Sequence, residues 1–185
     1  YCVDNNKNKI EFLFLGYIAE RKGVWLLLEA IESIKNKLDG KVVFNIGGNG
    51  EVDKLQALIK QKKLSDIVNY IGWVSDDNKI QYLNQSDAYI LPSYNEGLPI
   101  SVLEAMTYKL PIISTSVGGI PEVVKNKVNG FLIEPGNKKE LKDALEFVIN
   151  NTSEFKKFGE NSLQLVKPHL PEKVKKELCS FYHSL

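Results

Sequence analysis

Residues 91–104, LPSYNEGLPISVLE, carry two acidic side chains eight positions apart and join a strand pattern to a helix pattern. The apolar run 88–91 predicts a short buried strand, and Pro99 suits the first position of the helix that follows. Glu96 is therefore expected in a loop at the end of a strand, and Glu104 about two turns into the helix. The two carboxylates are expected to reach two places along an extended ligand. The spacing alone is equally compatible with two solvated surface charges.

Strand and helix patterns alternate along the rest of the chain. Apolar runs predict strands at 10–15, 41–46, 68–73, 88–91, 111–115 and 131–133. Helical periodicity predicts helices at about 24–38 and 51–63, from Ser75 as N-cap to Gln85, after Pro99, and from about 138 onward, with Pro168 and Pro171 separating a final helix. This alternation predicts an α/β, three-layer, Rossmann-like fold: a doubly wound, six-stranded parallel sheet with helices on both faces and extra C-terminal helices.

The domain organisation follows from the same patterns. The polar residues 1–9 indicate a linker or a truncation boundary, residues 10–167 one Rossmann-like domain, and residues 168–185 a C-terminal helix. With 185 residues, 43% hydrophobic and 25% charged, the chain is long enough for one domain with a substantial core.

Ligands of a doubly wound sheet bind beyond the carboxyl ends of the strands, where the strand order reverses. If the strand order is 3-2-1-4-5-6, the first and fourth strands are neighbours there. The loop 16–23, with Arg21 and Lys22, would then lie beside the loop 93–99, with Glu96. We therefore expect a cationic loop and an acidic loop to face each other across one crevice.

Composition excludes several classes of function. A net charge of +1 gives no support to nucleic-acid binding, which needs a basic face. Only His169 and His183 are present, too few for a histidine-rich metal centre or a Ser-His-Asp triad. Cys2 and Cys179 are expected as free thiols in a reducing compartment, with a disulfide between the termini less favoured. No apolar run approaches the ~20 residues of a membrane span and no signal peptide is evident, so a cytoplasmic location is expected, with surface attachment to a membrane left open.

Familiar phosphate-binding motifs do not occur. The loop after the first strand reads GYIAERKG, and the turn GGNG at 47–50 lacks the last glycine of G-x-G-x-x-G. Glycines at the ends of the first, second and fifth strands indicate either backbone that approaches a ligand or tight packing, and packing would explain most of them. Arg21 and Lys22 could neutralise a diphosphate or be ordinary solvated cations. Glu96 and Glu104 could accept hydrogen bonds from sugar or ribose hydroxyls; paired glycosidase carboxylates are less favoured, because that chemistry requires a fixed short separation.

Five segments occur in a characteristic order: FLGYIAERKGV, NIGGNGE, YIGWVSDDNKIQYLNQSDAYILPSYNEGLPISVLEAM, PIISTSVGGIPEVV and NGFLIEPGN. Together they resemble the C-terminal half of the retaining glycosyltransferases of family 4, which have the GT-B fold of two Rossmann-like domains around a cleft. The resemblance covers nearly the whole chain, and the combined pattern is far more specific than any one segment. It implies that residues 10–167 hold a nucleoside-diphosphate sugar.

The resemblance also implies roles for individual residues. Glu96 and Glu104 would be the E-x7-E pair, Glu96 near the transferred sugar and Glu104 at the ribose, with Glu96 and Lys22 in the catalytic role. The residues implied to bind the donor are Gly16, Arg21, Lys22, Val74, Glu96, Gly97, Leu98, Pro99 and Glu104. Where many relatives carry arginine, this chain has Tyr17, which reduces the basic pair on the diphosphate to Lys22 unless Arg21 substitutes.

Partners follow from the same resemblance. The expected substrate is a nucleotide sugar, with no bound metal or other cofactor and no nucleic acid. The acceptor site is expected in a preceding domain of the same protein, so this chain alone should transfer little or nothing; that domain could also attach the protein peripherally to the inner face of a membrane. Two alternatives stay open: half of a nucleotide-sugar epimerase, and a non-catalytic nucleotide-binding or interaction domain.

Overall fold

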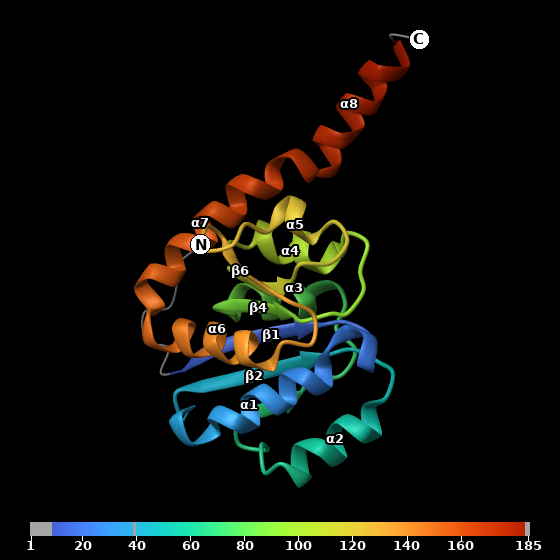
Figure 1. Ribbon diagram of the computed structural model, residues 1–185. Coiled ribbons are helices and arrows are strands. Elements are labelled where there is room, and N and C mark those ends of the chain that lie inside the picture. The colour runs from blue at the N-terminus through green and yellow to red at the C-terminus, as the bar shows by residue number, and fades with distance from the viewer. Residues whose placement is uncertain (1–8, 39, 184–185) are drawn as a thin grey trace.

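The computed structural model of the chain describes residues 9–38 and 40–183 (Figure 1). The predictions for Cys2 and for most of the N-terminal segment 1–9 lie outside these residues. The strands are β1 (Ile10–Leu15), β2 (Val42–Gly47), β3 (Val68–Tyr70), β4 (Ala88–Leu91), β5 (Ile112–Thr115) and β6 (Gly130–Ile133). The α-helices are α1 (Val24–Leu38), α2 (Val52–Gln61), α3 (Asp76–Gln85), α4 (Ile100–Thr107), α5 (Ile120–Val123), α6 (Lys138–Asn150), α7 (Thr152–Val166) and α8 (Pro171–His183). Two short 3-10 helices are η1 (Glu20–Lys22) and η2 (Lys167–His169).

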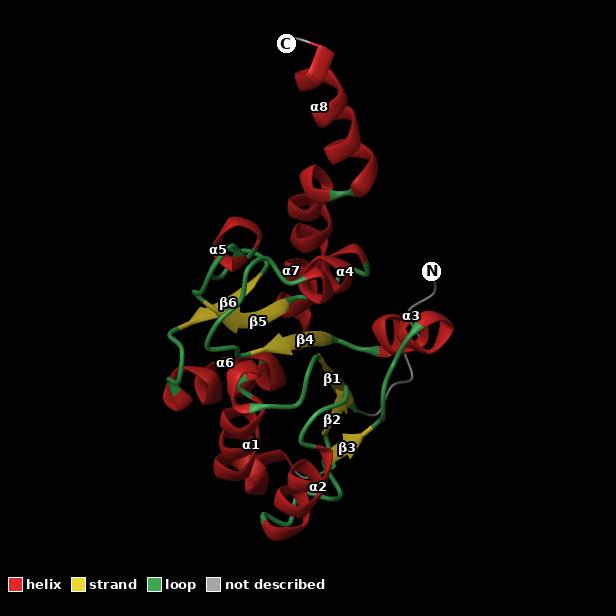
Figure 2. Ribbon diagram, turned by 90° about the vertical axis from the view of Figure 1, so that its right-hand side faces the viewer, coloured by secondary structure: helices red, strands yellow, loops and turns green. Residues whose placement is uncertain are grey.

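In the part of the chain that the structure describes, the strands form one six-stranded sheet in the order β3-β2-β1-β4-β5-β6. Every pairing is parallel. Helices α1, α2 and α6 lie on one side of the sheet and α3, α4 and α7 on the other (Figure 2). The predicted three-layer, doubly wound Rossmann-like fold is confirmed, and so is the strand order that places β1 beside β4.

Burial on both faces explains why the central strands are continuously apolar. Phe12, Leu13 and Phe14 of β1 are each at most 1% exposed, although neighbouring residues of a strand point to opposite faces. Phe12 pairs in register with Phe44 of β2, and their rings stack with centroids 4.6 Å apart. Such offset aromatic pairs add stability beyond the area that they bury.

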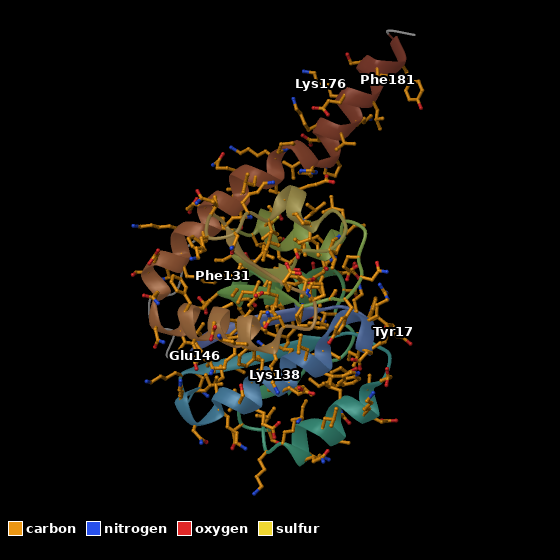
Figure 3. The ribbon with its side chains drawn as sticks, viewed as in Figure 1. Tyr17, Phe131, Lys138, Glu146, Lys176 and Phe181 are labelled. Atoms are coloured by element: carbon orange, nitrogen blue, oxygen red, sulfur yellow. The ribbon has the colours of Figure 1, made fainter. Side chains whose placement is uncertain are left out.

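A second aromatic cluster closes the β6 end of the sheet. Phe131 projects toward α6 and α7, where its ring lies 5.1 Å from Phe147 and 6.0 Å from Phe158, centroid to centroid (Figure 3). These contacts hold the two helices that follow the last strand against the sheet. This packing stabilises the β6 edge of the sheet, which is the edge opposite β3.

One predicted strand is too long. The segment 68–73 was expected to be extended throughout, but β3 ends at Tyr70. The Ile71 amide still donates to the Ile46 carbonyl at 3.0 Å, after which Gly72 turns the chain with a φ of +77°. Glycine adopts this left-handed conformation without the steric cost of a side chain. Trp73 is thereby turned outward and is 67% exposed.

The chain ends in a helix that leaves the body of the domain. The predicted final helix begins at Pro171 as α8, after η2, and extends away from the sheet (Figure 1). Its apolar side chains Val174, Leu178, Phe181 and Tyr182 are exposed. Within residues 9–38 and 40–183, none of the helices has the combined length and apolar character needed to cross a bilayer.

Candidate functional site

A cavity of about 560 Å³ lies beyond the carboxyl ends of β1, β2 and β3. Its walls come from the loops after these strands, from the first turn of α3 and from the first two turns of α4. The lining residues are Leu15, Gly16, Tyr17, Arg21, Lys22, Gly47, Gly48, Asn49, Trp73, Val74, Ser75, Asp76, Lys79, Ser101 and Glu104. Five predicted site residues are among them: Gly16, Arg21, Lys22, Val74 and Glu104. This is the edge of a doubly wound sheet at which ligands bind.

The cationic loop and the acidic loop are neighbours, as the strand order predicts, but they contact each other directly and do not face each other across a crevice. The Tyr94 amide donates to the Arg21 carbonyl at 2.9 Å, and Arg21 Nη1 donates to the Asn95 carbonyl at 3.1 Å. Gly23, with φ +72°, ends η1 so close to β4 that an added Cβ would lie 1.9 Å from the Pro92 carbonyl oxygen. The end of this loop therefore requires glycine, and its fixed position sets the place of the Lys22 side chain.

Lys22 and Glu96 form an ion pair between the two loops. Lys22 Nζ lies 2.6 Å from Glu96 Oε1, and the Ser93 hydroxyl donates to the same oxygen at 2.7 Å. The side chains are only 15% and 7% exposed, respectively. Charge-assisted hydrogen bonds of this kind are shorter and stronger than neutral ones, and poor access to water strengthens them further. Glu96 is thus held beside the cavity through Lys22.

The loop after β5 packs closely against the loop that carries Glu96. Gly118 has a φ of +53°, and an added Cβ would lie 2.0 Å from the Glu96 carbonyl oxygen. The Gly119 amide donates to the Gly97 carbonyl at 2.7 Å. Gly48 shows the same requirement, since its added Cβ would lie 1.8 Å from the Gly16 carbonyl oxygen. Of the two interpretations of the glycines, close packing of backbone therefore accounts for Gly48 and Gly118.

A second ion pair lies in the cavity wall. Lys79 Nζ of α3 lies 2.6 Å from Glu104 Oε1 of α4, and the side chains are 30% and 33% exposed. The sequence patterns did not single out Lys79, because it stands among polar residues of an ordinary exposed helix. Its position four residues after the N-cap Ser75 is the one signal that could have placed it near the carboxyl ends of the strands.

Tyr89 lies beneath the cavity, at the junction of β1 and β4. Its hydroxyl donates to the Leu15 carbonyl at 2.9 Å, and the residue is fully buried. Burial raises the pKa of the Tyr89 hydroxyl well above its ordinary value, because the charged form would lose its hydration. Tyr89 therefore acts as a neutral hydrogen-bond donor that ties the end of β1 to β4.

Four predicted residues do not line the cavity as the structure has it: Glu96, Gly97, Leu98 and Pro99. Glu96 contacts the cavity residue Lys22, and the backbone of Gly97 is exposed. Pro99 has no amide hydrogen, so donors at this end must come from its neighbours or from the first turn of α4, where Ser101 lines the cavity.

Two exposed aromatic rings stand at the cavity. Tyr17, which is 53% exposed, projects outward at the edge of the molecule (Figure 3), and Trp73 is 67% exposed. Trp73 was missed because the segment was expected to remain a strand. Among the described residues, no group of three or more His, Cys, Asp or Glu side chains is arranged to hold a metal ion.

Comparisons with known proteins place this geometry in a family. The family model for glycosyl transferases group 1 matches residues 3–165. An uncharacterized glycosyltransferase of Haemophilus influenzae is 31% identical over 166 residues, which are 89% of this chain and 46% of that protein. The chain thus spans about half the length of such curated relatives.

Solved structures agree with the fold. The C-terminal domain of the glycosyl transferase group 1 family protein LpcC from Francisella tularensis is 27% identical with a TM-score of 0.75, covering 85% of this chain and 84% of that one. Anabaena HepE in complex with UDP is 22% identical with a TM-score of 0.86, covering 96% of this chain and 50% of that one. Since the family model covers most of its length, the chain belongs to the group 1 family of glycosyl transferases.

Proposed function

We propose that this chain is the donor-binding half of a retaining glycosyltransferase. The enzyme would move a sugar from a nucleoside-diphosphate sugar to a glycan, a lipid or another acceptor. The observation that carries the proposal is the cavity at the carboxyl edge of the sheet, which holds cationic and carboxylate side chains within one space. A nucleoside-diphosphate sugar presents a matching set of groups: a diphosphate anion and two sets of sugar hydroxyls.

The charges of the cavity suggest how the donor is held. Lys22 and Arg21 stand at the end of β1, where the diphosphate would lie, and Glu104 stands across the cavity, where ribose hydroxyls would donate to it. The two lysines that line the cavity, Lys22 and Lys79, are each paired with a carboxylate. A bound donor would draw the Lys22 ammonium group toward its phosphates, and its ribose hydroxyls would donate to the acceptor sites of Glu104 that Lys79 leaves open.

Catalysis would consist of stabilising the leaving group. As the bond between the anomeric carbon and the diphosphate breaks, negative charge grows on the phosphate oxygens, and Lys22 stabilises that charge more than it stabilises the ground state. Glu96, held by Lys22 and Ser93, would contact the transferred sugar. We propose that these groups suffice without a metal or another cofactor. Because Tyr17 occupies the place of the usual arginine, Arg21 would supply the second positive charge.

The acceptor would bind to another domain of the same protein. The curated relative is about twice as long as the matched region, which leaves room for a second domain. Glu96 would act across the cleft between the two, so this chain alone is expected to bind donor weakly and to transfer little or nothing. Robust transfer by the 185-residue chain would contradict this.

Titration calorimetry with UDP, GDP, ADP and NAD tests the proposal. We expect a nucleoside diphosphate to bind, and Glu104→Ala to weaken its binding by about 10-fold or more, since a hydrogen bond to a charged group is lost. A further titration then uses a sugar nucleotide with the base that binds best, and Glu96→Ala should weaken its binding relative to that of the free diphosphate. Glu160→Ala is the control, because that carboxylate is 62% exposed and pairs with Lys109 outside the cavity.

Each outcome separates the proposal from an alternative. Binding of NAD alone would favour the epimerase interpretation. Binding of none of the four nucleotides would favour an interaction domain. Equal and negligible effects of Glu96→Ala and Glu104→Ala would remove the roles assigned to the two carboxylates.

A further inference from the structure

We infer that Lys79 is a positioning residue for Glu104, and that the pair sets the preference of the cavity for nucleotides that carry both ribose hydroxyls. This inference rests on the proposed function and adds to it a residue that the sequence patterns did not mark. It concerns how the carboxylate is held before the ligand arrives, and not the chemistry at the sugar.

The two side chains come from helices on the same face of the sheet. Lys79 lies in the first turn of α3 and Glu104 in the second turn of α4, and both helices lie on one side in Figure 2. The Lys79 amide donates to the Ser75 carbonyl at 3.3 Å, which anchors the residue at the start of its helix. Both side chains line the cavity, so their 2.6 Å contact forms part of its wall.

The contact leaves Glu104 able to accept a ligand. Lys79 contacts Oε1, and a carboxylate has about four acceptor sites on its two oxygens. A glutamate on an exposed helix surface samples several rotamers, and binding a ligand would have to select one of them. The ion pair selects a rotamer in advance, namely the one in which Glu104 lines the cavity. Preorganisation of this kind increases affinity, because the Glu104 side chain loses less conformational entropy when the ligand binds.

The position of Lys79 also fits the order of groups along a nucleotide. Lys79 follows Val74 on the β3 side of the cavity, where we place the base, whereas Arg21 and Lys22 lie on the β1 side, where we place the diphosphate. In a nucleoside diphosphate, the ribose lies between the base and the diphosphate. A carboxylate held by Lys79 is therefore placed for the ribose, and its charge is balanced by an ammonium group beside an anionic ligand.

The test compares each nucleotide with its 2′,3′-dideoxy analogue. UDP, GDP and ADP and their analogues are titrated by NMR into the 185-residue chain and into its Lys79→Met, Lys79→Arg and Glu104→Ala variants, and the ratio of the two dissociation constants is measured. The ratio isolates the hydroxyl contacts, because base and phosphate contacts are common to both ligands. Amide spectra of the same samples show that each variant is folded.

Lys62→Met is the matched control. Lys62 Nζ lies 2.6 Å from Glu32 Oε2, with side chains 20% and 39% exposed, and neither residue lines the cavity. We expect the unmodified chain to prefer the ribonucleotide about 10-fold or more, in line with a hydrogen bond to a charged acceptor. Lys79→Met should reduce this ratio about three- to tenfold, Lys79→Arg should largely retain it, and Lys62→Met should leave it unchanged.

The outcomes that overturn the inference are distinct. If Lys79→Met keeps the full hydroxyl preference, Lys79 does not position Glu104. If it weakens ribonucleotide and dideoxynucleotide equally, Lys79 contacts the phosphates instead. If the unmodified chain binds nucleotides without preferring the hydroxyls, the ribose role of the pair fails while nucleotide binding stands. If it binds none of the six ligands, the proposed function fails and this inference fails with it.

Discussion

Lys22→Met and Glu96→Gln each remove one charge from an ion pair that water reaches poorly. The N–O distance is 2.6 Å, and the side chains are 15% and 7% exposed. Removing one partner of a fully buried pair costs about 3–5 kcal/mol, because the other charge stays buried without compensation. Lys22 lines an open cavity, so water can partly solvate a remaining charge, and we expect about 2–3 kcal/mol for each single variant.

The double variant carries neither charge and should lose much less than the sum of the two. A double-mutant cycle should therefore give a coupling energy of about 2–3 kcal/mol. Urea unfolding of the four proteins measures it. With a slope of about 2 kcal/mol per molar urea, each single variant should unfold at about 1–1.5 M less urea than the unmodified chain.

The pair Lys138–Glu29 provides the control cycle. It joins α6 to α1 at 3.4 Å with side chains 52% and 49% exposed, and Lys138 is labelled in Figure 3. Exposed pairs contribute about 0–1 kcal/mol, so Lys138→Met and Glu29→Gln should have little effect and little coupling. Additive effects of Lys22→Met and Glu96→Gln, within about 0.5 kcal/mol, would refute the view that the two side chains form one poorly solvated unit.

Three further predictions concern the surroundings of the cavity. Gly118→Ala should destabilise the fold by about 2–4 kcal/mol in urea unfolding, since the added Cβ would strain a left-handed residue and clash with the Glu96 carbonyl. Gly40 also has a positive φ, +66°, but nothing lies within 4 Å of its added Cβ, so Gly40→Ala should cost only about 1–2 kcal/mol. Equal costs for the two variants would contradict the clash at Gly118. Nucleotide binding should quench the fluorescence of exposed Trp73, and a quench that survives Trp73→Phe would mean that the ligand lies elsewhere. Because the pKa of Tyr89 is raised, its hydroxyl stays protonated in the folded state but ionises in the unfolded state above about pH 10, so stability is lost as pH rises. Between pH 9 and 11, the free energy of unfolding of Tyr89→Phe should fall by about 1.4 kcal/mol less than that of the unmodified chain. Parallel pH profiles of the two proteins would contradict this.

Local sequence was sufficient for most of the fold. Strand β4 and helix α1 have the bounds that their apolar patterns predicted, because a strand buried on both faces must be continuously apolar and a helix packed on a sheet must carry one apolar stripe. The alternation of such segments restricts the fold to a few parallel arrangements. Where a pattern failed, at residues 71–73, Gly72 turned the chain in the middle of a run that was apolar enough for a strand.

The sequence also determined which loops we propose to bind the donor. The strand pattern alone places Arg21 and Lys22 after β1 and Glu96 after β4, at the carboxyl edge of the sheet. This prediction needs no information about tertiary contacts. Only the tertiary structure decided how the charges are paired. Lys22 meets Glu96 across 74 positions and Lys79 meets Glu104 across 25, separations with no local period that a pattern could reveal. Those partners are fixed by the order of the strands and the direction in which each helix leaves the sheet, which depend on packing of the whole domain.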